Sequence, residues 1–143
     1  MRKLVHQQLS YQLTGIFFNV HKKLGRFCRE KQYADCIEKL IQETKIPYKR
    51  EIEIQLLNSS SPKGNKIDFI IDNKIIIDTK AKPFITKEDY RQMQRYLQSA
   101  NIELGLIVNF RSLYLKPKRI LNIKLFHSEH SDGNSDYSDR LKQ

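Results

Sequence analysis

The chain has 143 residues, a length suited to one domain with its own hydrophobic core. Lysine and arginine outnumber aspartate and glutamate by 26 to 16, so the formal net charge is +10. This excess favours a polyanionic partner over solubility alone as its explanation, and the lack of any run of 18 apolar residues argues against a membrane protein.

Two helices are predicted in the first 44 residues. Apolar residues recur at helical spacing after Ser10, which we expect to be the N-cap, as far as Leu24. A second helix is expected from about Arg29 to Thr44. Alternating polar and apolar residues then predict a strand over residues 49–57, and a loop follows it.

The second half of the chain is predicted to alternate strands with one helix. The extended segments are residues 66–71, 75–80, 103–110 and a short closing element over 112–120. Thr86 and Asp89 match a capping box for a third helix that runs to about Ala100. The order α-α-β-β-β-α-β predicts an α/β fold with a mixed sheet flanked by helices.

The N-terminal residues and the two cysteines indicate the cellular compartment, and the C-terminal residues indicate where the folded domain ends. Residues 1–10 are too short and polar for a signal peptide, and Cys28 and Cys36 match no metal or redox spacing. We therefore expect a cytoplasmic protein with reduced thiols. Residues 127–143 lack periodicity and carry more acids than bases, which predicts a disordered tail after a domain over residues 1–126 with a charge near +12.

Three charged residues interrupt two predicted apolar strands. Residues two apart in a strand share a face, so Asp78 and Lys80 project together. Asp68 lies on the preceding strand, and its face depends on the turn between them. A two-residue turn at Asp72 and Asn73 would separate the aspartates, whereas a loop of odd length or a bulge would place them on one face.

Two adjacent carboxylates repel each other, and a divalent cation removes this penalty. Ligands that are all oxygen suit Mg²⁺ or Mn²⁺. A lysine beside the metal can orient or deprotonate a water and stabilise charge on a phosphate. Asp68, Asp78 and Lys80 therefore suit metal-dependent phosphodiester hydrolysis, although spacing alone leaves open a structural ion pair between Asp78 and Lys80.

The same trio resembles the PD-(D/E)XK signature of restriction-endonuclease-like nucleases, and the wider chain resembles the GxxExxR family within that superfamily. The matching segments are VHKKLG (20–25) followed by Glu30 and Tyr33, DFIIDNKIIIDTKA (68–81), QMQRYL (92–97) and GLIVNF (105–110). They span roughly residues 9 to 121. The chain departs from the family at Ile67, where proline is usual, at Arg26 and Phe27, where a Gly-Pro-Gly turn is usual, and at Asp78, where glutamate is usual.

The resemblance implies a restriction-endonuclease-like core, nuclease activity and a Mg²⁺ or Mn²⁺ cofactor. Asp68 and Asp78 would hold the metal with help from Glu30. Lys80 would activate water, and Gln92 would orient the site. Glu30 has a competing interpretation as an acid that the helix dipole favours at a helix start.

The resemblance also implies a nucleic-acid partner, and we expect DNA rather than RNA. Tyr96 lies one helical turn after Gln92 and would help to position the site or the DNA, although an ordinary core position is the alternative. Arg91 and Arg95 could follow a phosphate backbone together with Lys82, or could simply form a solvated helix face. No recognition helix or zinc module is apparent, so sequence-specific base reading is not expected.

Two other functions stay open at this stage. One is a nucleic-acid-binding domain of the same fold without turnover, and the other is a scaffold that binds proteins. Only the carboxylate and lysine set favours the enzyme over these. A homodimer would suit the cleavage of two strands, but no feature of the sequence requires one.

Overall fold

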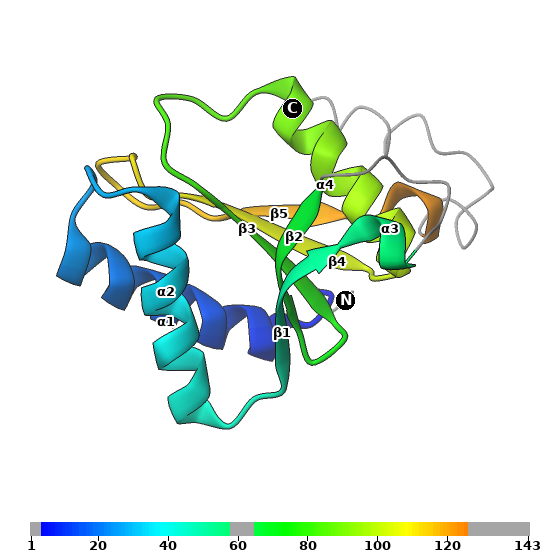
Figure 1. The fold of residues 1–143 in the computed structure, drawn as a ribbon, viewed down its shortest axis with the longest axis horizontal. Helices are drawn as coiled ribbons and strands as arrows, with labels where there is room; N and C mark the ends of the chain where they lie inside the picture. The colour runs from blue at the N-terminus through cyan, green and yellow to red at the C-terminus, as the bar shows by residue number, and fades with distance from the viewer. Residues whose placement is uncertain (1–3, 58–64, 126–143) are drawn as a thin grey trace.

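A mixed five-stranded sheet forms the centre of the computed structural model, which describes residues 4–57 and 65–125 (Figure 1). The strands are β1 (Tyr48–Glu53), β2 (Lys66–Ile71), β3 (Ile75–Lys80), β4 (Leu104–Asn109) and β5 (Lys118–Leu121). They lie in the order β1-β2-β3-β4-β5, and β3 with β4 is the parallel pair. The helices are α1 (Gln7–Leu24), α2 (Glu30–Thr44), α3 (Ile54–Leu57) and α4 (Lys87–Ala100).

The helices cover both faces of the sheet, which confirms the predicted fold class. α1 and α2 enclose one core with Phe69 and Ile77, whereas α4 encloses a second core with Ile76 on the other face. Figure 1 shows α1 and α2 on one side of the sheet and α4 on the other. Because successive strand residues point to opposite faces, Asp78 lies on the α4 side with Ile76.

The first helix begins earlier than predicted, because α1 starts at Gln7 and His6 occupies the N-cap position. The expectation that Ser10 caps this helix is therefore wrong. Ser10 is buried inside the helix, where its hydroxyl donates to the Gln7 carbonyl (3.0 Å) and accepts from Arg119 of β5 (2.7 Å). The contact with Arg119 is a tertiary one, which local sequence does not reveal.

The strand predicted over residues 49–57 is wrong in its second half. β1 ends at Glu53, and the chain continues as the short helix α3. Ile54 is fully buried in the core beneath α4, while Leu56 is 82% exposed. The alternation of polar and apolar residues over 54–57 therefore belongs to a short helix that buries one side, and not to a strand. The closing element predicted over residues 112–120 is present as β5, but this strand begins only at Lys118. Residues 127–143, predicted as a tail, lie outside the described part of the chain.

Within residues 4–57 and 65–125, none of the helices has both the length and the apolar character needed to cross a membrane.

Candidate active site

The β2–β3 turn brings the two predicted metal-binding aspartates onto one face. Ile71 pairs with Ile75, which leaves three residues in the turn. Two of them, Asp72 and Asn73, have left-handed backbone conformations with φ of 51° and 52°. The turn is therefore the odd-length alternative, and continuing the register places the two aspartates opposite each other across β2 and β3.

The backbone pairing between β2 and β3 stops at Phe69 and Ile77. Beyond that point the Asp68 side chain, not the backbone of β2, bonds to β3. Its Oδ2 accepts hydrogen bonds from the Thr79 backbone N–H (2.7 Å) and the Thr79 hydroxyl (2.8 Å). The Asp68 carboxylate thus satisfies a backbone donor that the strand ladder leaves open. These bonds hold Asp68 beside Asp78 at the end of the two strands.

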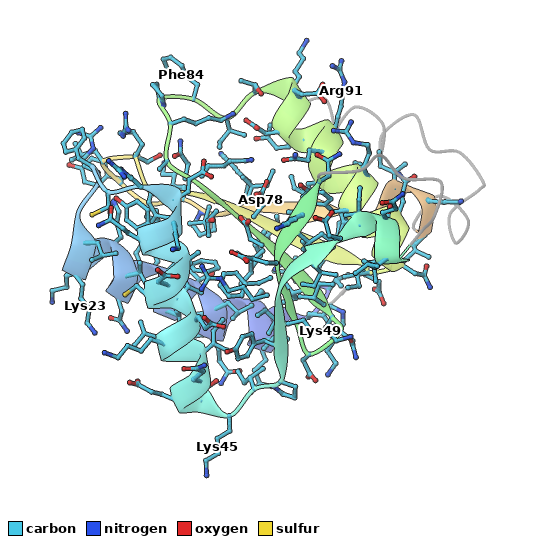
Figure 2. The ribbon with its side chains drawn as sticks, in the orientation of Figure 1. Lys23, Lys45, Lys49, Asp78, Phe84 and Arg91 are labelled. Carbon is cyan, nitrogen blue, oxygen red and sulfur yellow. The ribbon has the colours of Figure 1, made fainter. Side chains whose placement is uncertain are left out.

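Asp78 is 4% exposed, and its Oδ2 is buried without a hydrogen-bond partner. Lys80 Nζ lies 3.3 Å from this oxygen, an ion-pair distance without hydrogen-bond geometry. The pKa of Asp78 is raised to about 7, because burial and then the charge and hydrogen bond of Asp68 outweigh the lowering effect of the Lys80 ammonium. Figure 2 shows Asp78 on the side of the sheet that α4 covers.

Lys80 is the centre of a polar cluster on this face. Its Nζ donates to Gln92 Oε1 (3.2 Å) and lies 3.8 Å from Asp89 Oδ1 as well as close to Asp78. Burial alone would lower the pKa of Lys80, but the charges of Asp78 and Asp89 outweigh it and raise the pKa. Lys80 is therefore held as a cation.

Asp89 belongs to this cluster, although the sequence predicted it only as a capping residue. It forms the capping box with Thr86, whose backbone N–H (2.7 Å) and hydroxyl (3.0 Å) donate to Asp89 Oδ2. The same oxygen pairs with Lys82. Burial opposes ionisation of Asp89, but the hydrogen bonds from Lys82 and Thr86 prevail and lower its pKa. The i,i+3 spacing from Asp89 to Gln92 places both on one helix face, and this spacing could have revealed it.

Tyr96 lies on the same side of α4 but is 3% exposed and part of the core between α4 and the sheet. Burial raises its pKa, and the charges of Asp78 and Asp68 add to that effect. The tyrosine is therefore close to the carboxylates while occupying a core position, which is the alternative given from the sequence.

Glu30 is the first residue of α2 and is exposed. Its charge contributes to the raised pKa of Lys80, so it acts on the cluster electrostatically. However, among the described residues no three or more Asp, Glu, His or Cys side chains are arranged to hold a metal ion. Asp68 and Asp78 therefore face each other without Glu30 as a third ligand in this structure.

The predicted phosphate-binding arginines lie on the outer side of α4. Arg91 and Arg95 are exposed, and both pair with Glu88 at 3.4 and 3.3 Å. Figure 2 shows Arg91 pointing away from Asp78. Lys82, in contrast, is half-buried and directed to Asp89. Of the three, Lys82 is the one that the structure brings to the cluster.

Asn109 is a further site residue that sequence reasoning did not single out. Its side chain accepts from the Lys82 backbone N–H (3.2 Å) and donates to the Lys82 carbonyl (2.7 Å). These bonds join the end of β4 to the chain that follows Lys80. A polar residue at the end of an otherwise apolar strand was the signal that could have identified it.

His21, which resembles a family histidine, has a structural contact. Its Nε2 lies 2.9 Å from the Ser112 carbonyl oxygen, so it links α1 to the chain after β4.

The facing carboxylates fit a divalent cation. A buried carboxylate oxygen that accepts no hydrogen bond is costly, and a bound divalent cation would offset that cost. Mg²⁺ is commonly held by one or two carboxylates, with water and substrate phosphate supplying the other oxygens. Asp68 and Asp78 would be the protein ligands of such an ion.

Comparison with known proteins agrees with this geometry. Neither a curated protein nor a solved structure matches the chain significantly. The family model of the PD-(D/E)XK nuclease superfamily matches residues 7–120, which include the whole sheet except the last residue of β5. The chain therefore belongs to the PD-(D/E)XK nuclease superfamily.

Proposed function

We propose that this protein is a Mg²⁺-dependent (or Mn²⁺-dependent) nuclease that hydrolyses phosphodiester bonds, with DNA as its preferred substrate. The buried Oδ2 of Asp78, which accepts no hydrogen bond, is the observation that carries this proposal, because it lies beside Asp68 and 3.3 Å from the Lys80 ammonium. A metal cation would complete the coordination of this oxygen, whose burial is otherwise offset by the Lys80 ion pair without a hydrogen bond. Membership of a nuclease superfamily supports the same reading.

Each residue of the cluster has a distinct role in this proposal. Asp68 and Asp78 would hold the metal, which supplies a water of lowered pKa and neutralises phosphate charge. The raised pKa of Lys80 favours charge stabilisation at the phosphate over proton removal. Gln92 would orient the Lys80 ammonium through their 3.2 Å hydrogen bond, and Glu30 would assist from the start of α2.

We also propose that the chain belongs to the GxxExxR branch of the superfamily. The matching segments found in order along the sequence support this assignment, and the strand that ends in Asn109 contains most of the last one. A cytoplasmic location and a homodimer stay predictions from the sequence.

Cleavage of a mixed panel of single-stranded, duplex and branched DNA and RNA with Mg²⁺ tests the function. We expect the wild type to cut at least one substrate and Asp78→Asn to cut none. Asp72→Asn is the matched control, because it makes the same chemical change in the nearby turn, where asparagine tolerates the left-handed backbone. Equal cleavage by wild type and Asp78→Asn would show that the activity is a contaminant.

The excess of bases over acids is equally compatible with a second function, a nucleic-acid-binding domain without turnover. Binding of nucleic acid by the wild type, without cleavage of any substrate in the panel with Mg²⁺ or Mn²⁺, would support this alternative.

A further inference from the structure

Three loops meet at the end of the sheet where the parallel strands β3 and β4 finish. They are residues 25–29 between α1 and α2, residues 81–86 between β3 and α4, and residues 110–117 between β4 and β5, and we call them the three-loop rim. Lys80 is the last residue of β3, so the rim begins one residue after the proposed site. In Figure 1 all three loops lie on the upper left of the view.

Arg111 links the three loops by hydrogen bonds. Its Nε donates to the Arg26 carbonyl (3.2 Å), and Arg26 Nε donates back to the Arg111 carbonyl (2.8 Å). Arg111 Nη2 also donates to the Ala81 carbonyl (3.4 Å). The rim is therefore a connected surface rather than three independent loops, and such preorganisation lowers the entropic cost of binding.

Each loop of the rim carries one exposed aromatic side chain. Phe27, Phe84 and Tyr114 are 76%, 79% and 77% exposed. The other strongly exposed aromatics of the described residues, Tyr11 and Phe18, are on α1. Figure 2 shows Phe84 at the tip of the loop that leaves the strand of Asp78. Large exposed apolar side chains gathered beside a candidate site indicate a binding surface.

The charge of the rim is entirely positive. Its three segments contain no Asp or Glu and five bases, namely Arg26, Arg29, Lys82, Arg111 and Lys116. The guanidinium carbons of Arg26 and Arg111 lie 5.1 and 5.6 Å from the centre of the Phe27 ring. Two arginine side chains of the rim thus lie against its exposed Phe27 ring.

We infer that the three-loop rim binds unpaired nucleotides, so that the substrate is single-stranded nucleic acid or the single-stranded part of a branched one. This inference rests on the proposed function and names its substrate class. Aromatic side chains stack on bases of any sequence, and cationic side chains follow the backbone. Bases within a duplex are already stacked and do not offer their faces to such a surface.

The same charge disfavours a second copy of this chain as the occupant. A symmetric contact through the rim would oppose five bases with five bases and no acids. A polyanion with accessible base faces satisfies both the charge and the aromatic side chains.

The test is binding without divalent metal, measured by fluorescence anisotropy in EDTA so that no substrate is cut. The probes are labelled oligo(dT), oligo(rU) and a DNA duplex of equal length. The variant is Phe84→Ala/Tyr114→Ala, and the matched control is Tyr11→Ala/Phe18→Ala, which removes two exposed aromatics from α1. A third variant, Phe84→Trp/Tyr114→Trp, restores aromatic faces.

We expect the rim variant to lose about 10-fold or more in affinity for at least one single-stranded probe, with less than about 2-fold change on the duplex. The tryptophan variant should bind as well as the wild type, and the α1 control should be unchanged. An equal loss on single strands and duplex would overturn the inference, as would no loss on either single strand. A change from dimer to monomer in light scattering without a selective loss would also overturn it.

This experiment is independent of turnover. If the wild type cuts nucleic acid and Asp78→Asn does not, but the rim variant binds all probes normally, the nuclease proposal stands and the rim inference fails. If no substrate is cut but the selective loss is found, the rim binds single strands and the nuclease proposal fails.

Discussion

Asp78 combines deep burial with a facing carboxylate and an oxygen that accepts no hydrogen bond, which is unfavourable even beside the Lys80 ammonium. Proteins rarely keep such a group for stability alone, because an apolar side chain would fill the same place at lower cost. This cost is the basis of the proposal that Asp78 binds a metal ion. The neighbouring lysine reduces the cost without supplying a hydrogen bond.

The pH dependence of stability should reveal this cost. The pKa of Asp78 rises from 3.8 to about 7 on folding, so its protonated form favours the folded state. That contribution is complete below pH 3.8 and is lost as the pH rises to about 7. As the pH rises from 4 to 8, we predict that the unfolding free energy of metal-free Asp78→Asn increases relative to that of the wild type. Urea unfolding in EDTA measures both.

Glu103→Gln, a change at an exposed acid, is the control for this measurement and should show no such trend. Added Mg²⁺ should raise the melting temperature of the wild type at pH 8 and have a smaller effect on Asp78→Asn. If the difference in unfolding free energy between wild type and Asp78→Asn stayed constant across this pH range, Asp78 would not have a raised pKa in the folded protein.

Lys80 offers a prediction that separates metal binding from chemistry. Removing its ammonium in Lys80→Ala should leave Asp68 and Asp78 able to bind metal but slow cleavage by about 100-fold or more. Single-turnover cleavage at saturating Mg²⁺ measures the rate, and the Mg²⁺-dependent melting shift measures binding. Loss of the melting shift together with activity would instead assign Lys80 a role in building the metal site.

Helix α4 carries the polar side chains that surround Lys80, and its capping box fixes where it begins. Thr86 accepts from the Asp89 backbone N–H while Asp89 accepts from Thr86 in return. Asp89 therefore serves the cap and the site at once. The orientation of Gln92 one turn later depends on the same helix start.

Thr86→Ala should cost about 1 kcal/mol of unfolding free energy, because the N-cap acceptor is lost. It should also reduce the cleavage rate, since Asp89 loses one of its partners beside Lys80. Thr86→Ser keeps the hydroxyl and should restore both quantities. If urea unfolding shows no difference between Thr86→Ala and the wild type, the cap contributes less than its geometry indicates.

The elements that the sequence predicted well are those with strong local patterns. β2 and β3 match their predicted bounds because long isoleucine runs flank a turn, and α4 matches because its capping box is a local motif. Ser10 and residues 54–57 were misread because Arg119 and the core beneath α4 decide their surroundings. Both contacts join residues far apart in the chain.

Some features of the candidate site also follow from local sequence, whereas others depend on how the elements pack. The spacing of Asp68, Asp78 and Lys80 was readable, but the turn that decides their common face was only one of two alternatives until the register was known. Asp89 was recognised as a cap and not as a partner of Lys80, and Asn109 was not recognised at all. Their roles come from how α4 and β4 pack on β3.

The charge of the molecule bears on binding more than on the fold. Bases exceed acids by ten, and the three-loop rim concentrates five of them at one end of the sheet. Arg91 and Arg95 pair with Glu88 and Lys82 pairs with Asp89, whereas no acid of the described residues forms an ion pair with the other rim bases, Arg26, Arg29, Arg111 and Lys116. Nucleic-acid affinity should therefore depend strongly on salt.

If about five phosphates are engaged, the log–log slope of duplex affinity against salt should be roughly −4 to −5. Single strands should give a shallower slope of about −3.5 for the same number of phosphates. Anisotropy titrations in EDTA between about 50 and 200 mM salt measure both. A flat dependence would exclude a polyanionic partner and favour a protein-binding scaffold.

Metal binding between Asp68 and Asp78 is tested most directly by a crystal structure of the wild-type protein soaked in Mn²⁺. The geometry predicts an anomalous peak within coordination distance of both carboxylates, with Asp78 Oδ2 as one ligand, and no such peak in Asp78→Asn crystals soaked in the same way. An Mn²⁺-soaked wild-type structure without density between these two carboxylates would contradict it.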